Sequence, residues 1–160
     1  MKTIFTATAA FFVLANELRA DDSADCLRYF EADNYTNAIV PCTAAAEQGN
    51  VFSQVRLGWM YANGLGVAQD YAEAVRWYRA AAEQELADAQ HNLGWMYANG
   101  LGVAQDDAEA VRWYRAAAEQ ELADAQHNLG WMYANGLGVA QDDAEAVRWY
   151  RAAAEQELAD

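Results

Sequence analysis

The sequence LGWMYANGLGVAQDDAEAVRWYRAAAEQELADAQHN occupies Leu93–Asn128, and it recurs almost unchanged on both sides. The preceding copy, Leu57–Asn92, differs at one position, where Tyr71 stands in place of Asp107. The following copy, Leu129–Asp160, matches it at every residue that it contains. A fixed period of 36 residues is typical of a stacked repeat solenoid, in which each unit buries its apolar face against its neighbours. Because such arrays are usually recognition surfaces, the repeat favours binding over catalysis.

Within each unit, the spacing of apolar residues predicts a pair of helices. In Asp88–Asn99, apolar positions recur at the i, i+4, i+7 and i+8 spacing of one buried stripe. Gly94 lies inside this helix at a cost of about 1 kcal/mol in helix propensity, which indicates the close approach of a neighbouring helix. Gly100 ends the helix with a residue that accepts positive φ. A second helix begins after Asp106, so the unit is an αα-hairpin.

Charged side chains are expected to support the second helix. Asp106 can cap the first free backbone N–H groups, and Glu109 three residues later completes the arrangement of a capping box. Helical spacing also predicts two exposed ion pairs, Glu109 with Arg112 and Arg115 with Glu119.

The first twenty residues have the layout of a secretory signal peptide. Lys2 gives a basic start, Ile4–Ala15 is an apolar run too short to span a membrane, and Asn16–Ala20 is a polar tail. We expect cleavage after Ala20, with Ala15 as the weaker candidate, and an exported chain that is periplasmic or secreted. No later stretch is apolar enough to stop transfer, so no membrane insertion is expected after cleavage. A buried N-terminal helix is the alternative interpretation.

Two cysteines, Cys26 and Cys42, lie outside the near-identical repeats. In an exported chain an even number of cysteines favours a disulfide. Their midpoint, Asn34, lies in a turn-like stretch, so antiparallel helices over Asp22–Glu31 and Thr36–Gln48 would bring the sulfurs to matching heights. The chain-entropy model gives such a bridge about 3 kcal/mol of stabilisation. A free or redox pair is the alternative, and metal binding is disfavoured because no histidine lies near.

The formal net charge of −14 argues against several classes of function. An acidic surface repels phosphate backbones and anionic lipids, so nucleic acid and membrane surfaces are disfavoured partners. No Gly-x-Ser-x-Gly, His-Glu-x-x-His or phosphate-binding glycine loop is present. His91 and His127 are one repeat apart, so joint coordination of one metal ion is not expected. The sequence predicts no cofactor, no metal site and no enzyme.

The string LGWMYANGLGVAQDDAEAVRWYRAAAEQ, Leu93–Gln120, resembles the Sel1-like repeat, a relative of the tetratricopeptide repeat. Its Leu-Gly, Met-Tyr, Gly-x-Gly-Val, Gln-Asp, Ala-Val-x-Trp-Tyr and Ala-Ala elements occur in order three times, and the resemblance covers Ala44–Asp160. It implies an all-α fold, a right-handed α-solenoid of stacked antiparallel helix pairs, whose members act mainly as adaptors or scaffolds for protein complexes. Many bacterial members are exported, and some cysteine-rich ones carry disulfides between the helices of a hairpin.

About four hairpins are expected, of which the first is degenerate. The expected organisation is a signal peptide over 1–20, a capping repeat over 21–56, full repeats over 57–92 and 93–128, and an incomplete repeat over 129–160. Pro41 predicts a kink or a late helix start in the capping repeat.

The junctions between units depart from the family pattern. A glycine usually follows the second helix, but the full repeats have a glutamate there, at Glu85, Glu121 and Glu157. Because glutamate tolerates positive φ poorly, either the helix continues for another turn or each junction is strained, and we favour the longer helix, which would alter the solenoid pitch. After Asp160 no helix covers the last apolar stripe, which suggests end-to-end self-association, a missing partner or a truncated reading frame.

The candidate partner-binding residues lie on the first helix of each unit. His91 and Trp95 are four residues apart, on the side away from the buried stripe, and the other units repeat this arrangement. In solenoids of this family the first helices line the concave surface, so the tryptophans are expected to form an aromatic ladder or, equally, to fill the core between repeats. The full candidate set is Trp59, His91, Asn92, Trp95, His127, Asn128 and Trp131.

Two functions fit this pattern. The one we favour is an exported, non-catalytic scaffold or adaptor that binds a protein or peptide partner along the concave face, where a basic segment would suit the acidic surface. The alternative is a carbohydrate or cell-wall-fragment binder, or a weak envelope enzyme, that uses the tryptophan ladder.

Overall fold

The computed structural model describes residues 22–157, and these form helices joined by short connections. The signal peptide expected over residues 1–20 lies outside the described residues. A helix over residues 22–31 is followed by α2 (Tyr35–Glu47), α3 (Val51–Asn63), α4 (Tyr71–Ala82), α5 (Ala87–Asn99), α6 (Asp107–Ala118), α7 (Ala123–Asn135) and α8 (Asp143–Glu157).

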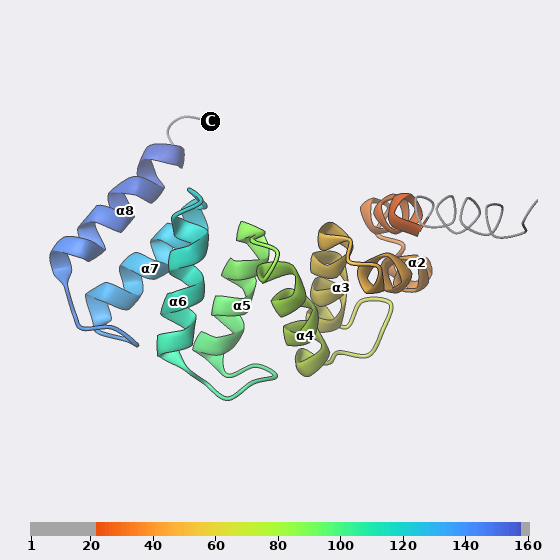
Figure 1. Cartoon of the computed structure of the whole chain (residues 1–160), viewed down its shortest axis with the longest axis horizontal. Coiled ribbons are helices and arrows are strands. Elements are labelled where there is room, and N and C mark those ends of the chain that lie inside the picture. The colour runs from red at the N-terminus through yellow and green to blue at the C-terminus, as the bar shows by residue number, and fades with distance from the viewer. Residues whose placement is uncertain (1–21, 158–160) are drawn as a thin grey trace, which may run out of the picture.

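Each helix packs mainly against the helices immediately before and after it, so the hairpins stack into an elongated arc (Figure 1). No strand occurs within residues 22–157. The predicted all-α solenoid of stacked helix pairs is confirmed.

A glycine in the first helix of each hairpin permits the close packing of its two helices. A Cβ atom on Gly94 would lie 2.9 Å from Cδ1 of Tyr114 and 3.3 Å from the carbonyl oxygen of Ala110, both in α6. The close approach predicted at Gly94 is therefore found, and it is made by the partner helix of the same hairpin. The other hairpins have the same contact, at Gly58 with Tyr78 and at Gly130 with Tyr150.

The second helix of each unit begins as predicted, and of the two predicted ion pairs the one between Glu109 and Arg112 is confirmed. Asp106 caps α6 by accepting hydrogen bonds from the backbone N–H groups of residues 108 and 109 at 3.0 Å. Glu109 pairs with Arg112 at 3.2 Å, and the Asp106 N–H donates to the carbonyl of Tyr97, so only half of the capping box forms. Arg115 donates to the Tyr133 hydroxyl of α7 at 2.8 Å instead of pairing with Glu119 within α6.

The predicted extension of the second helix is wrong at two junctions. Helix α4 ends at Ala82 and α6 ends at Ala118, and the glutamates that follow, Glu85 and Glu121, have φ values of 64° and 65°. The reversal is closed by the N–H of Leu86, which donates to the carbonyl of residue 81, a helix-ending bond of the Schellman type. A glutamate in this conformation costs about 1–2 kcal/mol. The third glutamate, Glu157, is the last residue of α8, which is thus longer than α4 and α6.

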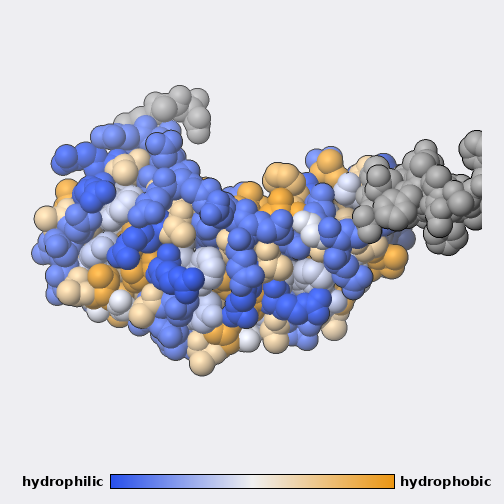
Figure 2. All heavy atoms as spheres, viewed as in Figure 1, coloured by the Kyte–Doolittle hydropathy of each residue, from blue (hydrophilic) through white to orange (hydrophobic). Residues whose placement is uncertain are grey.

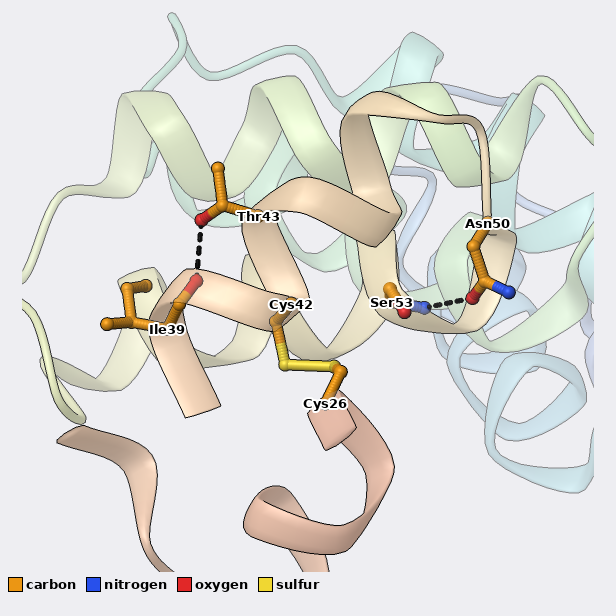
Figure 3. The surroundings of a disulfide bond; sticks show 6 residues. All are labelled: Cys26, Ile39, Cys42, Thr43, Asn50 and Ser53. Carbon is orange, nitrogen blue, oxygen red and sulfur yellow. Dashed lines mark hydrogen bonds between the residues drawn. A yellow bond between two sulfur atoms is a disulfide. The ribbon is translucent and has the colours of Figure 1, made fainter. Parts of the chain in front are cut away.

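The N-terminal unit is tied by the predicted disulfide (Figure 3). Cys26, in the helix over 22–31, is bonded to Cys42 in α2, and both side chains are fully buried. The chain reverses between these helices at Asp33, which has a φ of 53°. Helix α2 begins six residues before Pro41 and continues past it, so the late helix start is not observed.

Candidate functional site

The tryptophans of the first helices lie at the surface of the molecule. Trp59, Trp95 and Trp131 are 36%, 45% and 49% exposed, one each on α3, α5 and α7. None of the three is fully buried, so they do not serve only as core between repeats, although the ring of Trp59 also packs against Phe30 and Tyr35. In contrast, Trp77 and Trp113 of the second helices are buried, and Trp149 of the last one is half-buried.

Hollows separate the successive tryptophans. Between α3 and α5 a hollow of about 230 Å³ is lined by Trp59, Asn92 and Trp95, together with Tyr71 and other side chains. Between α5 and α7 a second hollow, of about 310 Å³, is lined on its two sides by Trp95 and Trp131. Since Trp95 borders both hollows, the three tryptophans and the space between them form one continuous surface, which we call the ladder face.

Three of the four polar candidates line these hollows, and the fourth, His91, contacts one of them. The Nε2 atom of His91 lies 2.9 Å from the Nδ2 atom of Asn128, which joins α5 directly to α7. Burial lowers the pKa of His91, against the opposing influence of nearby carboxylates. His127 is exposed and, with Asn128, lines the hollow between α5 and α7. Asn92 lines the hollow between α3 and α5. The structure thus brings the predicted residues together, and their role in binding stays a prediction.

The structure contains a third hollow that the sequence did not predict. It measures about 350 Å³ and lies where the N-terminal unit meets the first full repeat, and its lining consists of Phe30, Phe52, Val55, Arg56, Trp59, Leu86, Asp88 and Asn92. The available signal was a break in the repeat: the positions that correspond to Phe52, Val55 and Arg56 one unit later hold an aspartate, a histidine and an asparagine.

The arginines of the second helices serve the fold. Arg112 pairs with Glu109 in the same helix and stacks over the buried ring of Trp113, with its guanidinium carbon 4.9 Å from the ring centroid. The equivalent arginines, Arg76 and Arg148, make the same two contacts in α4 and α8. These ion pairs are exposed and contribute little to stability, so the main fixed contact of each arginine is with the tryptophan ring beneath it.

On the side drawn in Figure 2, most of the surface is hydrophilic and the hydrophobic areas are separate patches. Within residues 22–157, no three side chains of His, Cys, Asp or Glu gather as a metal-binding group. In the same part of the chain, no helix combines the length and the apolar character that crossing a membrane requires. The disulfide is typical of proteins that fold in an oxidising compartment.

Comparison with known proteins identifies the repeat. The family model "Sel1 repeat" matches residues 51–86, 87–122 and 123–158, so each matched unit begins at a first helix and includes one hairpin. No curated protein matches the chain.

Three of the solved structures that are similar to this chain illustrate the match. A Sel1 repeat protein from Oxalobacter formigenes is 39% identical with a TM-score of 0.77, over 81% of this chain and 54% of that one. The protein c5321, a protective antigen present in uropathogenic Escherichia coli strains, has an SLR fold and is 41% identical with a TM-score of 0.79, over 88% of this chain and 33% of that one. Helicobacter pylori cysteine rich protein B (hcpB) is 22% identical with a TM-score of 0.56, over 82% of this chain and 87% of that one, and shows the fold alone.

This chain therefore spans about half of the first of these proteins and a third of the second. Sel1 repeat proteins generally mediate protein–protein interactions, and their scaffolds are generally non-catalytic. The matched repeats cover most of the chain, and the stacked hairpins have the same architecture as the similar structures. The chain belongs to the Sel1 repeat family.

Proposed function

We propose that this chain is an exported, non-catalytic scaffold that binds a protein or peptide partner along the ladder face. The observation that carries the proposal is the exposure of Trp59, Trp95 and Trp131 on three successive first helices with hollows between them. Large aromatic side chains beside concave surface are typical of the residues that dominate binding energy in protein interfaces. An isolated exposed tryptophan would carry little weight, but a regular series of three gives an extended partner several anchoring points.

Two further observations support parts of this proposal. The Cys26–Cys42 disulfide and the signal-like residues 1–20 favour export to the periplasm or the exterior. The net charge of −14 favours a partner segment that is basic, because long-range attraction speeds association. Such binding would weaken as salt is added.

The test compares capture of partners from envelope and secreted fractions by residues 21–160 and by a variant with all three ladder tryptophans changed to alanine. A matched control changes one exposed residue per unit at equivalent positions of the repeat, Glu83→Gln, Glu119→Gln and Glu155→Gln. Circular dichroism establishes that both variants remain helical. A protein captured by the wild type and the control but lost by the tryptophan variant supports the proposal, and hydrogen exchange should then show protection of α3, α5 and α7. Equal capture by all three proteins would overturn it.

Glycan binding is the second candidate. The amides of Asn92 and Asn128 line the same hollows as the exposed indole rings, and this combination suits sugar recognition by stacking and hydrogen bonding. Saturable binding of soluble cell-wall fragments that is lost on Trp95→Ala, with no protein captured, would favour this function over the first.

Self-association is a further part of the proposal. Val147 on α8 is 54% exposed, whereas Val111 at the corresponding position of α6 is 4% exposed because a following hairpin covers it. Stacking of this face on another molecule would bury it. Sedimentation velocity should show a concentration-dependent oligomer that Val147→Glu abolishes, and a monomer at all concentrations would contradict this part.

A further inference from the structure

The hollow at the junction of the N-terminal unit and the first full repeat differs from the others in its chemistry. Its wall is aromatic: the rings of Phe30 and Trp59 meet edge to face with centroids 5.4 Å apart, and Phe52 is 57% exposed at its rim. Edge contacts of this kind hold the two rings in place. The volume of about 350 Å³ is at the lower end of the range of ligand pockets, enough for one or two side chains of a partner.

This hollow also contains a cation that makes no direct ion pair, although the carboxylate of Glu31 favours its charged form from a longer distance. Arg56 is half-buried, and its guanidinium carbon lies 5.7 Å from the centroid of the Phe30 ring. Among the side chains that the structure describes, no carboxylate lies within ion-pair distance of Arg56. The half-buried arginines of the full repeats, Arg79 and Arg115, each donate a hydrogen bond to a tyrosine hydroxyl of the next unit. An arginine that has lost part of its hydration and keeps its donors free is well suited to a planar anion.

The sequence of this hollow departs from the repeat at the positions that give it this chemistry. Residues 57–86 differ from residues 93–122 only at Tyr71, but three positions on one face of α3 carry other residues than their equivalents in α5. These substitutions are Phe52 for Asp88, Val55 for His91 and Arg56 for Asn92, at i, i+3 and i+4, and all three residues line the hollow. An acidic and polar helix face has become apolar and cationic.

We propose that this hollow binds the carboxy-terminal residue of a partner peptide, with an apolar side chain against Phe30, Phe52 and Trp59 and the terminal carboxylate on Arg56. The proposal rests on the proposed function, because it places the end of the partner at the N-terminal end of the ladder face. It commits to a peptide terminus because the guanidinium lies close to the aromatic wall. The ligand must therefore present an anion and an apolar group side by side, and a terminal residue carries both on one Cα atom.

Groups on the opposite wall fit this orientation. Asp88 and Asn92 of α5 line the hollow across from α3 and offer oxygen acceptors for the backbone N–H of the terminal residue. The same Asp88 disfavours a second carboxylate in the hollow, and the acidic chain as a whole disfavours a strongly acidic peptide. The expected ligand is thus a peptide with one carboxylate, at its end, and an apolar last residue.

Fluorescence anisotropy with residues 21–160 tests this assignment. The probes are labelled six-residue peptides of glycine, serine and lysine that end in phenylalanine, leucine or alanine, each made with a free carboxylate and as the carboxamide. We expect the phenylalanine and leucine acids to bind about tenfold or more tightly than their carboxamides, which corresponds to one charged hydrogen-bonded pair. Two controls probe specificity. The peptide acid that ends in alanine should bind more weakly than the phenylalanine and leucine acids. A peptide with an amidated end and an internal glutamate beside phenylalanine should not bind as tightly as the phenylalanine acid.

Substitutions in α3 test whether Arg56 and Phe52 account for the preference for peptide acids. Arg56→Asn and Phe52→Asp install the residues of the following unit, so the fold tolerates them at this helix position. Arg56→Asn should bind acid and carboxamide equally, and Phe52→Asp should weaken both. The matched control is Arg151→Gln, an exposed arginine of α8, which should retain the wild-type preference. Equal binding of acid and carboxamide by the wild type, a preference that survives Arg56→Asn, or no binding of any probe would each overturn the assignment.

The capture experiment on the ladder tryptophans separates the two proposals. A partner that is lost by the tryptophan variant but captured equally by wild type and Arg56→Asn would leave the scaffold function standing and reject this pocket. If both the tryptophan variant and Arg56→Asn fail to capture the partner, and the wild type prefers the peptide acids to their carboxamides, the scaffold function and this pocket are both supported.

Discussion

The side chain of Gln120, in the turn after α6, donates a hydrogen bond to the Oε1 atom of Gln90 in α5 at 2.8 Å. Gln90 is 5% exposed, and its own Nε2 atom donates to the carbonyl of Ala82 at the end of α4. One buried amide therefore links three consecutive helices across the boundary between two units. The same arrangement recurs at the other boundaries, at Gln54 with Gln84 and at Gln126 with Gln156.

Replacing this buried amide should loosen the junction. Gln90→Leu keeps the approximate size of the side chain but leaves the Gln120 amide and one acceptor site of Ala82 without their partner, which should cost about 1–2 kcal/mol of unfolding free energy. Urea denaturation followed by circular dichroism measures the change. Gln120→Ala, at an exposed position, should cost less, and an equal or smaller loss for Gln90→Leu would contradict the role of the buried amide.

Glycine should stabilise the junction where glutamate has positive φ. Glu121→Gly relieves a left-handed conformation with a φ of 65°, and we expect a gain of about 1 kcal/mol. The matched control is Glu119→Gly, two residues earlier, where φ is −68° and glycine adds only flexibility to the unfolded chain. Thermal unfolding should therefore move in opposite directions for the two variants. A lower melting temperature for Glu121→Gly would show that the strain is offset by contacts of the glutamate side chain.

Removing the disulfide should destabilise the N-terminal unit. The bond between Cys26 and Cys42 spans 16 residues, and its loss should cost about 3 kcal/mol by the chain-entropy model. Because each unit contacts mainly its neighbours, the loss should be concentrated in the helix over 22–31 and in α2. Hydrogen exchange of the Cys26→Ser, Cys42→Ser double variant measures this distribution. Added reductant should reproduce the effect in the wild type and leave the double variant unchanged.

Acid should weaken the contact between α5 and α7. Burial lowers the pKa of His91 below its ordinary value of 6.5, although Asp124 and Asp88 favour the charged form. The unfolded chain then binds a proton more readily than the folded chain, so the stabilising contribution of neutral His91 is complete above pH 6.5 and is lost as the pH falls below that value.

The variant His91→Val tests the direction of this pH dependence. Valine is a suitable replacement because Val55 occupies the corresponding position in α3. Unfolding free energies measured between about pH 8 and pH 5 should decline less in the variant than in the wild type. The comparison at the alkaline end, where the imidazole is neutral in both states, isolates the effect of the new side chain on packing. A steeper decline in the variant would mean that the carboxylates outweigh burial at this site.

Much of the fold could be predicted from the sequence because its information is local. The apolar spacing of Asp88–Asn99 predicts the first helix to within one residue, and Asp106 marks the start of the second. Gly94 indicated the close packing of the hairpin, and the position of Asn34 midway between the cysteines indicated the disulfide. Each of these features depends on residues within one hairpin, where helical geometry fixes which side chains meet.

The tertiary structure alone decided the features that depend on how one hairpin lies on the next. Glutamate disfavours positive φ, so local preference pointed to a longer helix, yet at Glu121 the chain must reverse to place α7 against α6. Arg115 bonds to a hydroxyl 18 residues away, and Asn128 meets His91 across 37 residues. The exposure of Trp95 and the hollow beside Arg56 have the same origin. The sequence states the period of the array, but the rotation between neighbouring hairpins determines which side chains of adjacent units meet and which face solvent.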